Sequence, residues 1–286
     1  MSKIENILEM RNVTTVFGSG VTETYANKNV DLQIATEPAG IVSIVGESGS
    51  GKTTVARTLL GLQQPTSGDV LWRGKNLGSL SSENRSQYRS EVQAVFQDPY
   101  GIFNPFYKIN HVFDMVLGRF KLASSKAEAQ QKIEESLQAV GLRPGEVLGR
   151  YPHQLSGGER QRVMLARAHL MRPKVIIADE AISMLDVAIR AIVMNIFLDF
   201  RDNDGMSTVF ITHDLSAAHY LGGDMMVMRR GEVVESGDVD DVLQNPQHAY
   251  TQLLLESLPN PDPDQRWSSS GENLAELEKA AGVSEH

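Results

Sequence analysis

A glycine-rich run follows the short apolar stretch IVSIV and precedes a helix-like stretch. It reads Gly46-Glu47-Ser48-Gly49-Ser50-Gly51-Lys52-Thr53 and fits the pattern G-x-x-x-x-G-K-[ST]. Glycines let successive backbone N–H groups turn toward phosphate oxygens at a helix N-terminus, where the helix dipole favours anions. We expect Lys52 to reach the β- and γ-phosphates of a nucleotide and the Thr53 hydroxyl to bind Mg²⁺. The residues expected to bind the nucleotide are Gly46, Ser48, Gly49, Ser50, Gly51, Lys52, Thr53 and Thr54.

An acidic pair, Asp179-Glu180, follows a second apolar stretch, VIIA. An aspartate at the carboxyl end of a strand can hold Mg²⁺, and an adjacent glutamate can polarise an attacking water molecule. We therefore expect Asp179 to be a metal ligand and Glu180 to be the catalytic base. Because an acidic pair at a strand end can also be an ordinary solvated loop, other motifs must decide between the two interpretations.

The deciding segment is Leu155-Ser156-Gly157-Gly158-Glu159, about 24 residues before the acidic pair. A serine and two glycines ahead of a helical run can cap the helix and bind an anion. In this order with the glycine loop and the acidic pair, the segment resembles the signature of the ABC ATPase family, and the resemblance covers about residues 5–258. It implies two cassettes paired head to tail, with Ser156, Gly157 and Gly158 contacting ATP held by the partner's glycine loop.

Further elements of this family follow in the expected order. Gln97 resembles the glutamine that approaches Mg²⁺ and the attacking water, so the resemblance makes it a catalytic and metal-binding candidate. Ser183-Met184-Leu185-Asp186 resembles the D-loop, which crosses the dimer interface and places Asp186 at the nucleotide. His213, in TVFITHD, resembles the switch histidine that contacts the γ-phosphate and is the third catalytic candidate.

An aromatic residue near the start of the chain is expected to stack on adenine. Phe17 occupies the position that the resemblance implies, and Tyr25 is a nearby competitor. Stacking on an aromatic ring would bind the base without base-specific hydrogen bonds.

The chemistry needs an α/β framework to position it. Alternating apolar residues near 7–15 and 29–34 predict antiparallel strands, with a short strand pair around Asp69–Arg73. Apolar strands at 40–45, 174–180, 208–214 and 224–237 alternate with helices such as 187–202, which predicts a parallel sheet. The resemblance implies a P-loop NTPase (RecA-like) core with an antiparallel β-subdomain and an inserted α-helical subdomain. We expect an ATPase domain over 5–258, the helical subdomain at about 98–165, and a C-terminal tail over 259–286.

The composition narrows the classes of function. The 286 residues contain no cysteine, which excludes disulfides, thiol catalysis and cysteine-ligated metal centres. The net charge of −9 disfavours a dedicated nucleic-acid-binding protein. No run approaches the roughly 18 apolar residues that span a bilayer, and the start MSKIENILEM lacks the apolar run of a signal peptide. We therefore expect a cytoplasmic protein, and the family resemblance implies that it is attached peripherally to the cytoplasmic face of the inner membrane.

The sequence around the motifs is similar to that of importer cassettes for oligopeptides, dipeptides and nickel. The similar segments are QDPYGIFNP, RYPHQLSGGERQRV and NPQHAYTQLLLESLP. This resemblance implies an ATP-hydrolysing motor that works with a second cassette, identical or homologous, two transmembrane permease subunits and, indirectly, a solute-binding protein. It also implies that Tyr100–Phe106 lie near the groove that receives the permease. A charge at Phe103 or Phe106 should then uncouple or detach the permease while sparing ATP binding.

Departures from the family leave the solute open. Ala181 and Met184 replace the more usual proline and small residue, and the C-terminal cysteine cluster of many relatives is missing. Peptides are the leading solute, with oligosaccharides and nickel as alternatives. A soluble ABC ATPase acting on DNA or ribosomes is disfavoured, because the interval of about 100 residues between the glycine loop and the signature shows no sustained heptads.

Overall fold

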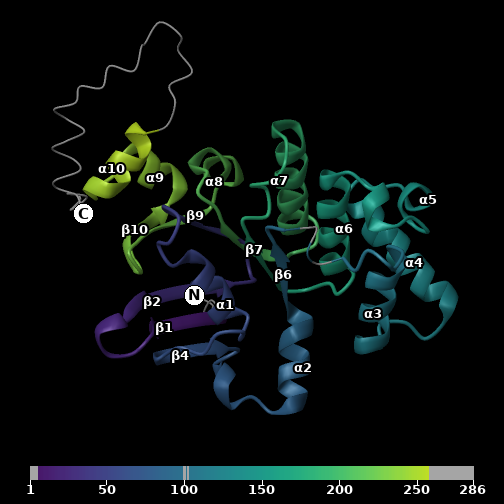
Figure 1. The fold of residues 1–286 in the computed structure, drawn as a ribbon, viewed down its shortest axis with the longest axis horizontal. Helices are drawn as coiled ribbons and strands as arrows, with labels where there is room; N and C mark the ends of the chain where they lie inside the picture. Colours follow the sequence, from purple (N-terminus) through teal and green to yellow (C-terminus); the bar gives the residue numbers. More distant parts are fainter. Residues whose placement is uncertain (1–5, 99–100, 102, 258–286) are drawn as a thin grey trace, which may run out of the picture.

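The computed structural model describes residues 6–98, 101 and 103–257, and Figure 1 shows its arrangement. An antiparallel sheet lies on one side of the molecule, with strand order β2-β1-β4-β5. Its strands are β1 (Asn6–Phe17), β2 (Thr24–Ala35), β4 (Ser67–Trp72) and β5 (Lys75–Asn76). β1 pairs antiparallel with both β2 and β4, which confirms the predicted antiparallel subdomain.

The central sheet has the strand order β10-β9-β3-β8-β7-β6. Its strands are β3 (Ile41–Val45), β6 (Val92–Phe96), β7 (Val175–Asp179), β8 (Ser207–Ile211), β9 (Asp224–Arg229) and β10 (Glu232–Asp238). All neighbours from β9 to β6 pair in parallel, and β3, β7 and β8 are buried along their whole length. Such burial on both faces explains why these strands read as continuous apolar runs, and the parallel sheet confirms the predicted α/β class.

The observed sheet differs from the predicted one in two places: one predicted strand was wrong, and one strand was missed. The stretch 224–237 is not one strand, because the chain reverses at Arg230-Gly231, both with positive φ, and β10 pairs antiparallel with β9. β6 was not predicted at all. Its sequence VQAVF is short and follows the polar helix α2 (Ser82–Glu91), so it has no distinct pattern of its own.

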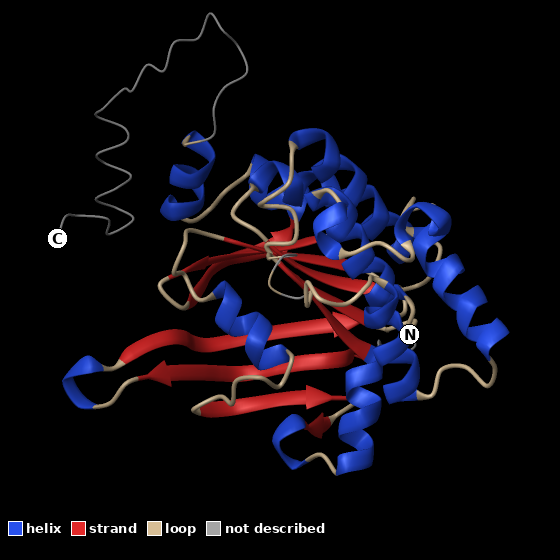
Figure 2. Cartoon of the chain, turned by 45° about the vertical axis from the view of Figure 1, so that its right-hand side comes forward, coloured by secondary structure: helices blue, strands red, loops and turns tan. Residues whose placement is uncertain are grey.

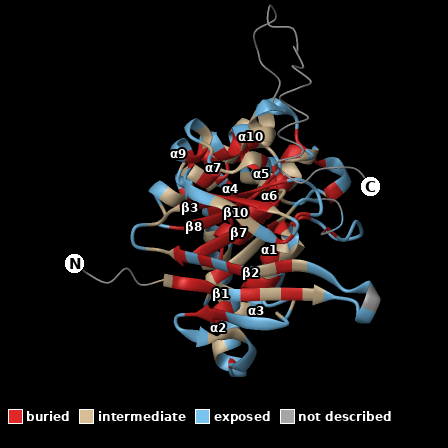
Figure 3. Ribbon diagram, turned by 90° about the vertical axis from the view of Figure 1, so that its left-hand side faces the viewer, coloured by how far each residue is buried: buried red, intermediate tan, exposed pale blue. Residues whose placement is uncertain are grey.

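The helix that follows the glycine loop, α1 (Lys52–Leu59), lies between the two sheets (Figures 1 and 2). Its residues Val55, Ala56 and Leu59 are buried in one apolar cluster with residues of both sheets, among them Leu8 and Ile44. Figure 3 shows that the buried residues are concentrated in the interior strands and the exposed residues along the outer edges. The glycine loop is therefore anchored by packing on both sides of the helix it introduces.

A group of helices lies beyond the β6 edge of the central sheet (Figure 1). It consists of α3 (Asn110–Phe120), α4 (Lys126–Ala139), α5 (Pro144–Val147) and α6 (Gly157–His169). Phe113, Leu137 and Val163 are fully buried within it. Arg167 of α6 donates to the carbonyl of Ala94 in β6 at 3.1 Å, which ties the helical group to the sheet. The limits of the predicted domain and helical subdomain stay a prediction.

The remaining helices cover the rest of the central sheet. They are α7 (Val187–Asp202), α8 (Leu215–Leu221), α9 (Val239–Gln244) and α10 (Ala249–Glu256), and the last three pack with β9 and β10 in a separate apolar cluster. Among the described residues, no helix is both long and apolar enough to cross a membrane. The predicted tail at 259–286 lies outside the described residues.

Candidate nucleotide-binding site

Four neighbouring strands of the central sheet end at the same edge. The register aligns Phe96 with Asp179, and Asp179 with Ile211, at the ends of β6, β7 and β8. Ile44 of β3 pairs with Ile211 in turn. The residues that follow these strands include Gln97, Glu180, His213 and Gly46, so candidates from four separate parts of the sequence lie along one edge. The carboxyl edge of a parallel sheet is the usual place for a ligand in such folds.

The glycine loop bends sharply between β3 and α1. Gly46 and Gly51 have φ of 147° and 107°, which L-residues with side chains rarely adopt. A Cβ atom on Gly46 would lie 2.1 Å from the Met228 carbonyl oxygen, and one on Gly51 would lie 2.1 Å from the Ala26 carbonyl oxygen. The loop is thus pressed between β9 and β2, and only glycine fits at these two positions.

Lys52 lies buried beneath the loop. Its Nζ donates to the carbonyl oxygens of Gly46 and Glu47, each at 2.7 Å, and lies 3.4 Å from the Ser50 hydroxyl. Burial lowers the pKa of the Lys52 ammonium, and the nearby carboxylates of Glu180 and Asp179 oppose that shift. A cation held in this way is positioned to attract a phosphate group at the loop.

Thr53 and Asp179 form a pair of oxygen donors at the start of α1. The Thr53 hydroxyl donates to Oδ1 of Asp179 at 3.4 Å, and Asp179 is buried at the end of β7. Burial raises the pKa of the Asp179 carboxyl, with Glu180 adding to the shift and the Thr53 bond opposing it. Hard oxygen donors of this kind fit Mg²⁺, which is usually held by one or two carboxylates together with substrate phosphates.

Glu180 and His213 are in direct contact. Nδ1 of His213 lies 3.0 and 2.9 Å from the two carboxylate oxygens of Glu180. An ionised carboxylate can only accept, so this contact is a hydrogen bond when Nδ1 of His213 carries a proton. Glu180 has a positive φ of 53°, and its backbone N–H donates to the carbonyl of Ile211 at 2.9 Å. The sheet edge therefore holds the Glu180 backbone in a rare conformation and directs its carboxylate to the histidine.

The signature segment caps α6. The Ser156 hydroxyl accepts from the Glu159 backbone N–H at 3.2 Å, while the Glu159 carboxylate accepts from the Ser156 backbone N–H at 2.8 Å. The Ser156 backbone N–H and the Ser156 hydroxyl, which also donates to this carboxylate at 2.8 Å, lower the pKa of Glu159. Gly158 lies against Ile189 of α7, where a Cβ atom would come within 2.7 Å of a side-chain carbon. The segment is thus a rigid capping box.

The signature segment and the glycine loop precede helices that lie in different parts of the fold. α6 belongs to the helical group beyond β6, whereas α1 lies between the two sheets (Figure 1). Ser156, Gly157 and Gly158, at the start of α6, thus belong to a different part of the fold from Lys52, at the start of α1.

The D-loop is held by a residue that the sequence did not single out. Arg190 of α7 donates to the carbonyls of Ser183 at 3.2 Å and Leu185 at 2.9 Å, and lies 3.6 Å from the Asp214 carboxylate. It thereby joins the D-loop to the N-cap of α8, in the segment that follows β8. Asp186 is exposed just before α7. An arginine four residues after the D-loop aspartate was the available signal.

Three further candidates, Gln97, Phe17 and Tyr25, lie at the surface. Gln97 is exposed directly after β6. Phe17 and Tyr25 are 44% and 49% exposed at the same end of the β1–β2 pair, where Phe17 pairs with Thr24. The choice between Phe17 and Tyr25 for adenine stays a prediction.

The surface role expected of Phe103 was wrong, whereas the location of the permease groove stays a prediction. Phe103 is 5% exposed and packs in the apolar cluster of the helical group, so a charge there would disrupt that core. Phe106, three residues later, is 86% exposed and available to a partner. Tyr100 lies outside the described residues.

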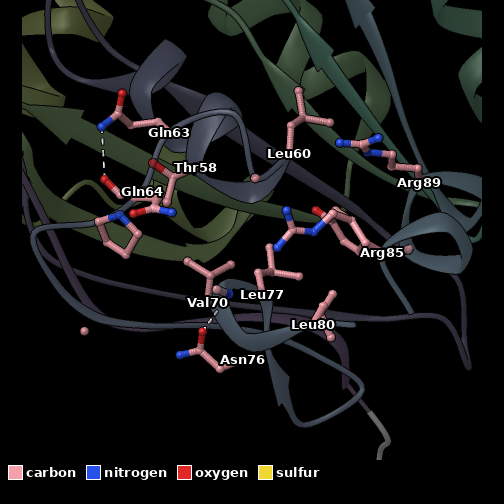
Figure 4. Close-up of a pocket in the computed structure, with 15 residues that line it drawn as sticks. Thr58, Leu60, Gln63, Gln64, Val70, Asn76, Leu77, Leu80, Arg85 and Arg89 are labelled. Atoms are coloured by element: carbon pink, nitrogen blue, oxygen red, sulfur yellow. Dashed lines mark hydrogen bonds between the residues drawn. The ribbon is translucent and has the colours of Figure 1, made fainter. Parts of the chain in front are cut away.

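A pocket of about 340 Å³ lies away from this site, at the C-terminal end of α1 (Figure 4). Leu60, Gln63 and Gln64 line it from the α1 side, and Arg85 and Arg89 line it from α2. None of the predicted nucleotide-binding or catalytic residues contributes to its lining.

Comparison with protein families gives two matches. Residues 28–183 match the family described as ABC transporter, and residues 234–282 match the family described as Oligopeptide/dipeptide transporter, C-terminal region. The first match spans the glycine loop, the signature and the acidic pair. The second begins in β10, includes α10 and runs past the described residues.

Known proteins and solved structures are similar over most of the chain. The oligopeptide transport ATP-binding protein OppF of Streptococcus pyogenes serotype M1 is 38% identical over 260 residues, which is 91% of this chain and 84% of the relative. The dipeptide transport ATP-binding protein DppF of Haemophilus influenzae is 40% identical over 225 residues, 79% of this chain and 68% of the relative. The dimeric ATP-binding cassette MJ0796, solved with ADP and Pi, superposes with a TM-score of 0.70 at 29% identity and covers 81% of this chain and 98% of that structure.

Proposed function

The chain belongs to the ABC transporter family, and we propose that it is the ATP-hydrolysing motor subunit of an importer for oligopeptides or dipeptides. The observation that carries this proposal is the convergence of the glycine loop, Asp179-Glu180 and His213 at one edge of the central sheet. The peptide class is supported by the match of residues 234–282 and by relatives that transport peptides. Nothing in the described site favours nickel or an oligosaccharide over a peptide.

The mechanism follows from the physics of phosphoryl transfer, in which positioning and charge neutralisation dominate. The loop amides would hold the phosphates, and the Lys52 ammonium, held by the Gly46 and Glu47 carbonyls, would direct its remaining N–H toward the β- and γ-oxygens. Glu180 would take the proton of the attacking water, with His213 holding its carboxylate in place. Thr53, Asp179 and Gln97 would hold Mg²⁺, which when bound neutralises charge on the phosphate oxygens.

A complete site requires a second cassette. Since α6 belongs to the helical group beyond β6 and α1 lies between the two sheets, we infer that Ser156, Gly157 and Gly158 would contact ATP bound to the partner's loop. Asp186 would lie at the interface between the two cassettes. A pair of cassettes is supported by the dimeric cassettes among the similar structures, and we infer that the two pair head to tail. The adenine would stack on Phe17 or Tyr25.

Transport further requires proteins outside this chain. We infer two permease subunits, with Phe106 near their docking groove, and a solute-binding protein that delivers the peptide. The cassette would then be attached peripherally to the cytoplasmic face of the membrane.

The test is ATP hydrolysis by the purified chain, alone and with its permease subunits in lipid vesicles, with and without Mg²⁺. We expect slow turnover alone and faster turnover with permease and a peptide-loaded binding protein. Binding protein loaded with nickel or with an oligosaccharide serves as the matched control. Stimulation by one of these and not by peptides would refute the peptide class, whereas rapid turnover by a strict monomer would refute the transporter role.

A further inference from the structure

One peptide group of the glycine loop is bonded on both of its sides. The carbonyl oxygen of Gly46 accepts from Lys52 Nζ at 2.7 Å. The N–H of the same peptide group, which belongs to Glu47, donates to the Tyr250 hydroxyl at 3.0 Å. Since a peptide group is planar, its orientation sets the direction of both bonds at once. A group that holds the N–H therefore also holds the carbonyl that positions Lys52.

Tyr250 reaches the loop from α10, about 200 residues further along the chain. Its side chain is only 3% exposed, and the guanidinium of Arg229 lies 4.9 Å from its ring centroid. Burial raises the pKa of the Tyr250 phenol, so the hydroxyl is neutral and can accept a hydrogen bond at physiological pH. The ring is therefore held firmly while its hydroxyl faces the loop.

The segment that precedes α10 is itself fixed to the central sheet. The Glu235 carboxylate in β10 accepts from the backbone N–H groups of Gln247 at 2.7 Å and His248 at 3.0 Å. The His248 ring then caps α10 by accepting from the Tyr250 backbone N–H at 3.1 Å. These hydrogen bonds fix the position of Tyr250 relative to the glycine loop.

We propose that Tyr250 is a positioning residue for nucleotide binding, acting through the Gly46–Glu47 peptide group on Lys52 and on the loop amides. The proposal rests on the proposed ATPase function. It gives the C-terminal region a part in the nucleotide site, although this region lies far from the loop in sequence. Because the loop is already ordered in the free protein, it loses less conformational entropy when phosphate binds. This smaller entropy cost strengthens the binding of substrate and of transition state equally, so the loss of Tyr250 should change KM and not kcat.

The test compares Tyr250→Phe with Tyr88→Phe. Both variants delete one buried tyrosine hydroxyl that is bonded to the backbone, since the Tyr88 hydroxyl donates to the Leu59 carbonyl at the far end of α1. We expect Tyr250→Phe to raise the Kd and KM for ATP about 3- to 10-fold, the effect of one lost hydrogen bond, with kcat unchanged. Tyr88→Phe should lower the melting temperature and leave the Kd unchanged.

A double variant tests the route through Lys52. Once Lys52→Ala has removed the ammonium, Tyr250→Phe should weaken ATP binding much less than it does in the wild type. Hydrogen exchange at the Glu47 amide supplies a reading independent of ATP. It should be protected in the wild type and accelerate in Tyr250→Phe.

Each result decides the matter. A Tyr250→Phe protein that binds ATP like the wild type, an effect matched by Tyr88→Phe, or a Glu47 amide that exchanges freely in the wild type would overturn the role of Tyr250. In these cases a wild type that binds and hydrolyses ATP leaves the proposed function standing. A folded wild type without ATP binding would instead overturn both.

Discussion

Replacing Glu180 by glutamine removes the proposed base while keeping the shape of the side chain. In the structure both carboxylate oxygens lie about 3 Å from Nδ1 of His213 (3.0 and 2.9 Å). The glutamine amide retains one oxygen that can accept from this nitrogen, so the local geometry should survive. What is lost is the ability to take a proton from water.

The magnitude follows from that loss. General-base catalysis contributes about 10²- to 10⁴-fold, equivalent to about 3–5 kcal/mol of activation free energy, so kcat should fall by this factor. ATP binding should persist, because Lys52 and the loop amides do not depend on Glu180 for their contacts with Gly46 and Glu47. Binding without hydrolysis should then accumulate the ATP-bound dimer.

The assay measures phosphate release under saturating ATP, together with the dimer fraction by size-exclusion chromatography with light scattering. Glu91→Gln is the matched control, because its side chain is 17% exposed against 16% for Glu180 and it bonds to Arg73 away from the site. We expect this control to hydrolyse ATP like the wild type. A Glu180→Gln protein that turns over within about threefold of the wild type would refute the assignment of the base, since even weak general-base catalysis exceeds that factor.

Three further outcomes are expected. Lys52→Ala should weaken ATP binding by monomers, whereas Ser156→Arg should spare it and block hydrolysis in the partner's site; titration of monomers with a fluorescent ATP analogue distinguishes the two, and equal losses would contradict a shared site. Phe106→Glu should reduce co-purification with the permease at an unchanged melting temperature, because this side chain is 86% exposed, and retention of the full complex would argue against docking there. Burial lowers the pKa of His169 below its ordinary 6.5, so the folded state favours the neutral ring. The contribution of this neutral ring to the free energy of unfolding should be fully present above pH 6.5 and be lost as the pH falls through the lowered pKa. His169→Gln should flatten this loss in melts at pH 7.5 and 5.5, and parallel pH profiles of variant and wild type would exclude His169 as the cause.

Features that depend on neighbouring residues could be predicted from the sequence. The glycine loop works through a strand, a turn and a helix that are contiguous, and Gly46 and Gly51 adopt conformations that glycine alone adopts easily. The buried strands β3, β7 and β8 are apolar along their whole length for the same local reason. The short strand β6 could not be predicted in this way, because five residues after a polar helix show too little periodicity.

Features that depend on distant residues could be decided only by the tertiary structure. Phe103 and Phe106 belong to the same short segment, yet one is core and the other is surface, because packing against the helical group and not residue type separates them. The sequence likewise contains Glu180, His213 and Tyr250 but no measure of their separation. Their contacts exist because parallel pairing aligns the ends of β7 and β8, and because β10 positions α10 over the glycine loop. Residue types therefore defined the chemistry available to this chain, while long-range pairing and packing defined which of those residues meet.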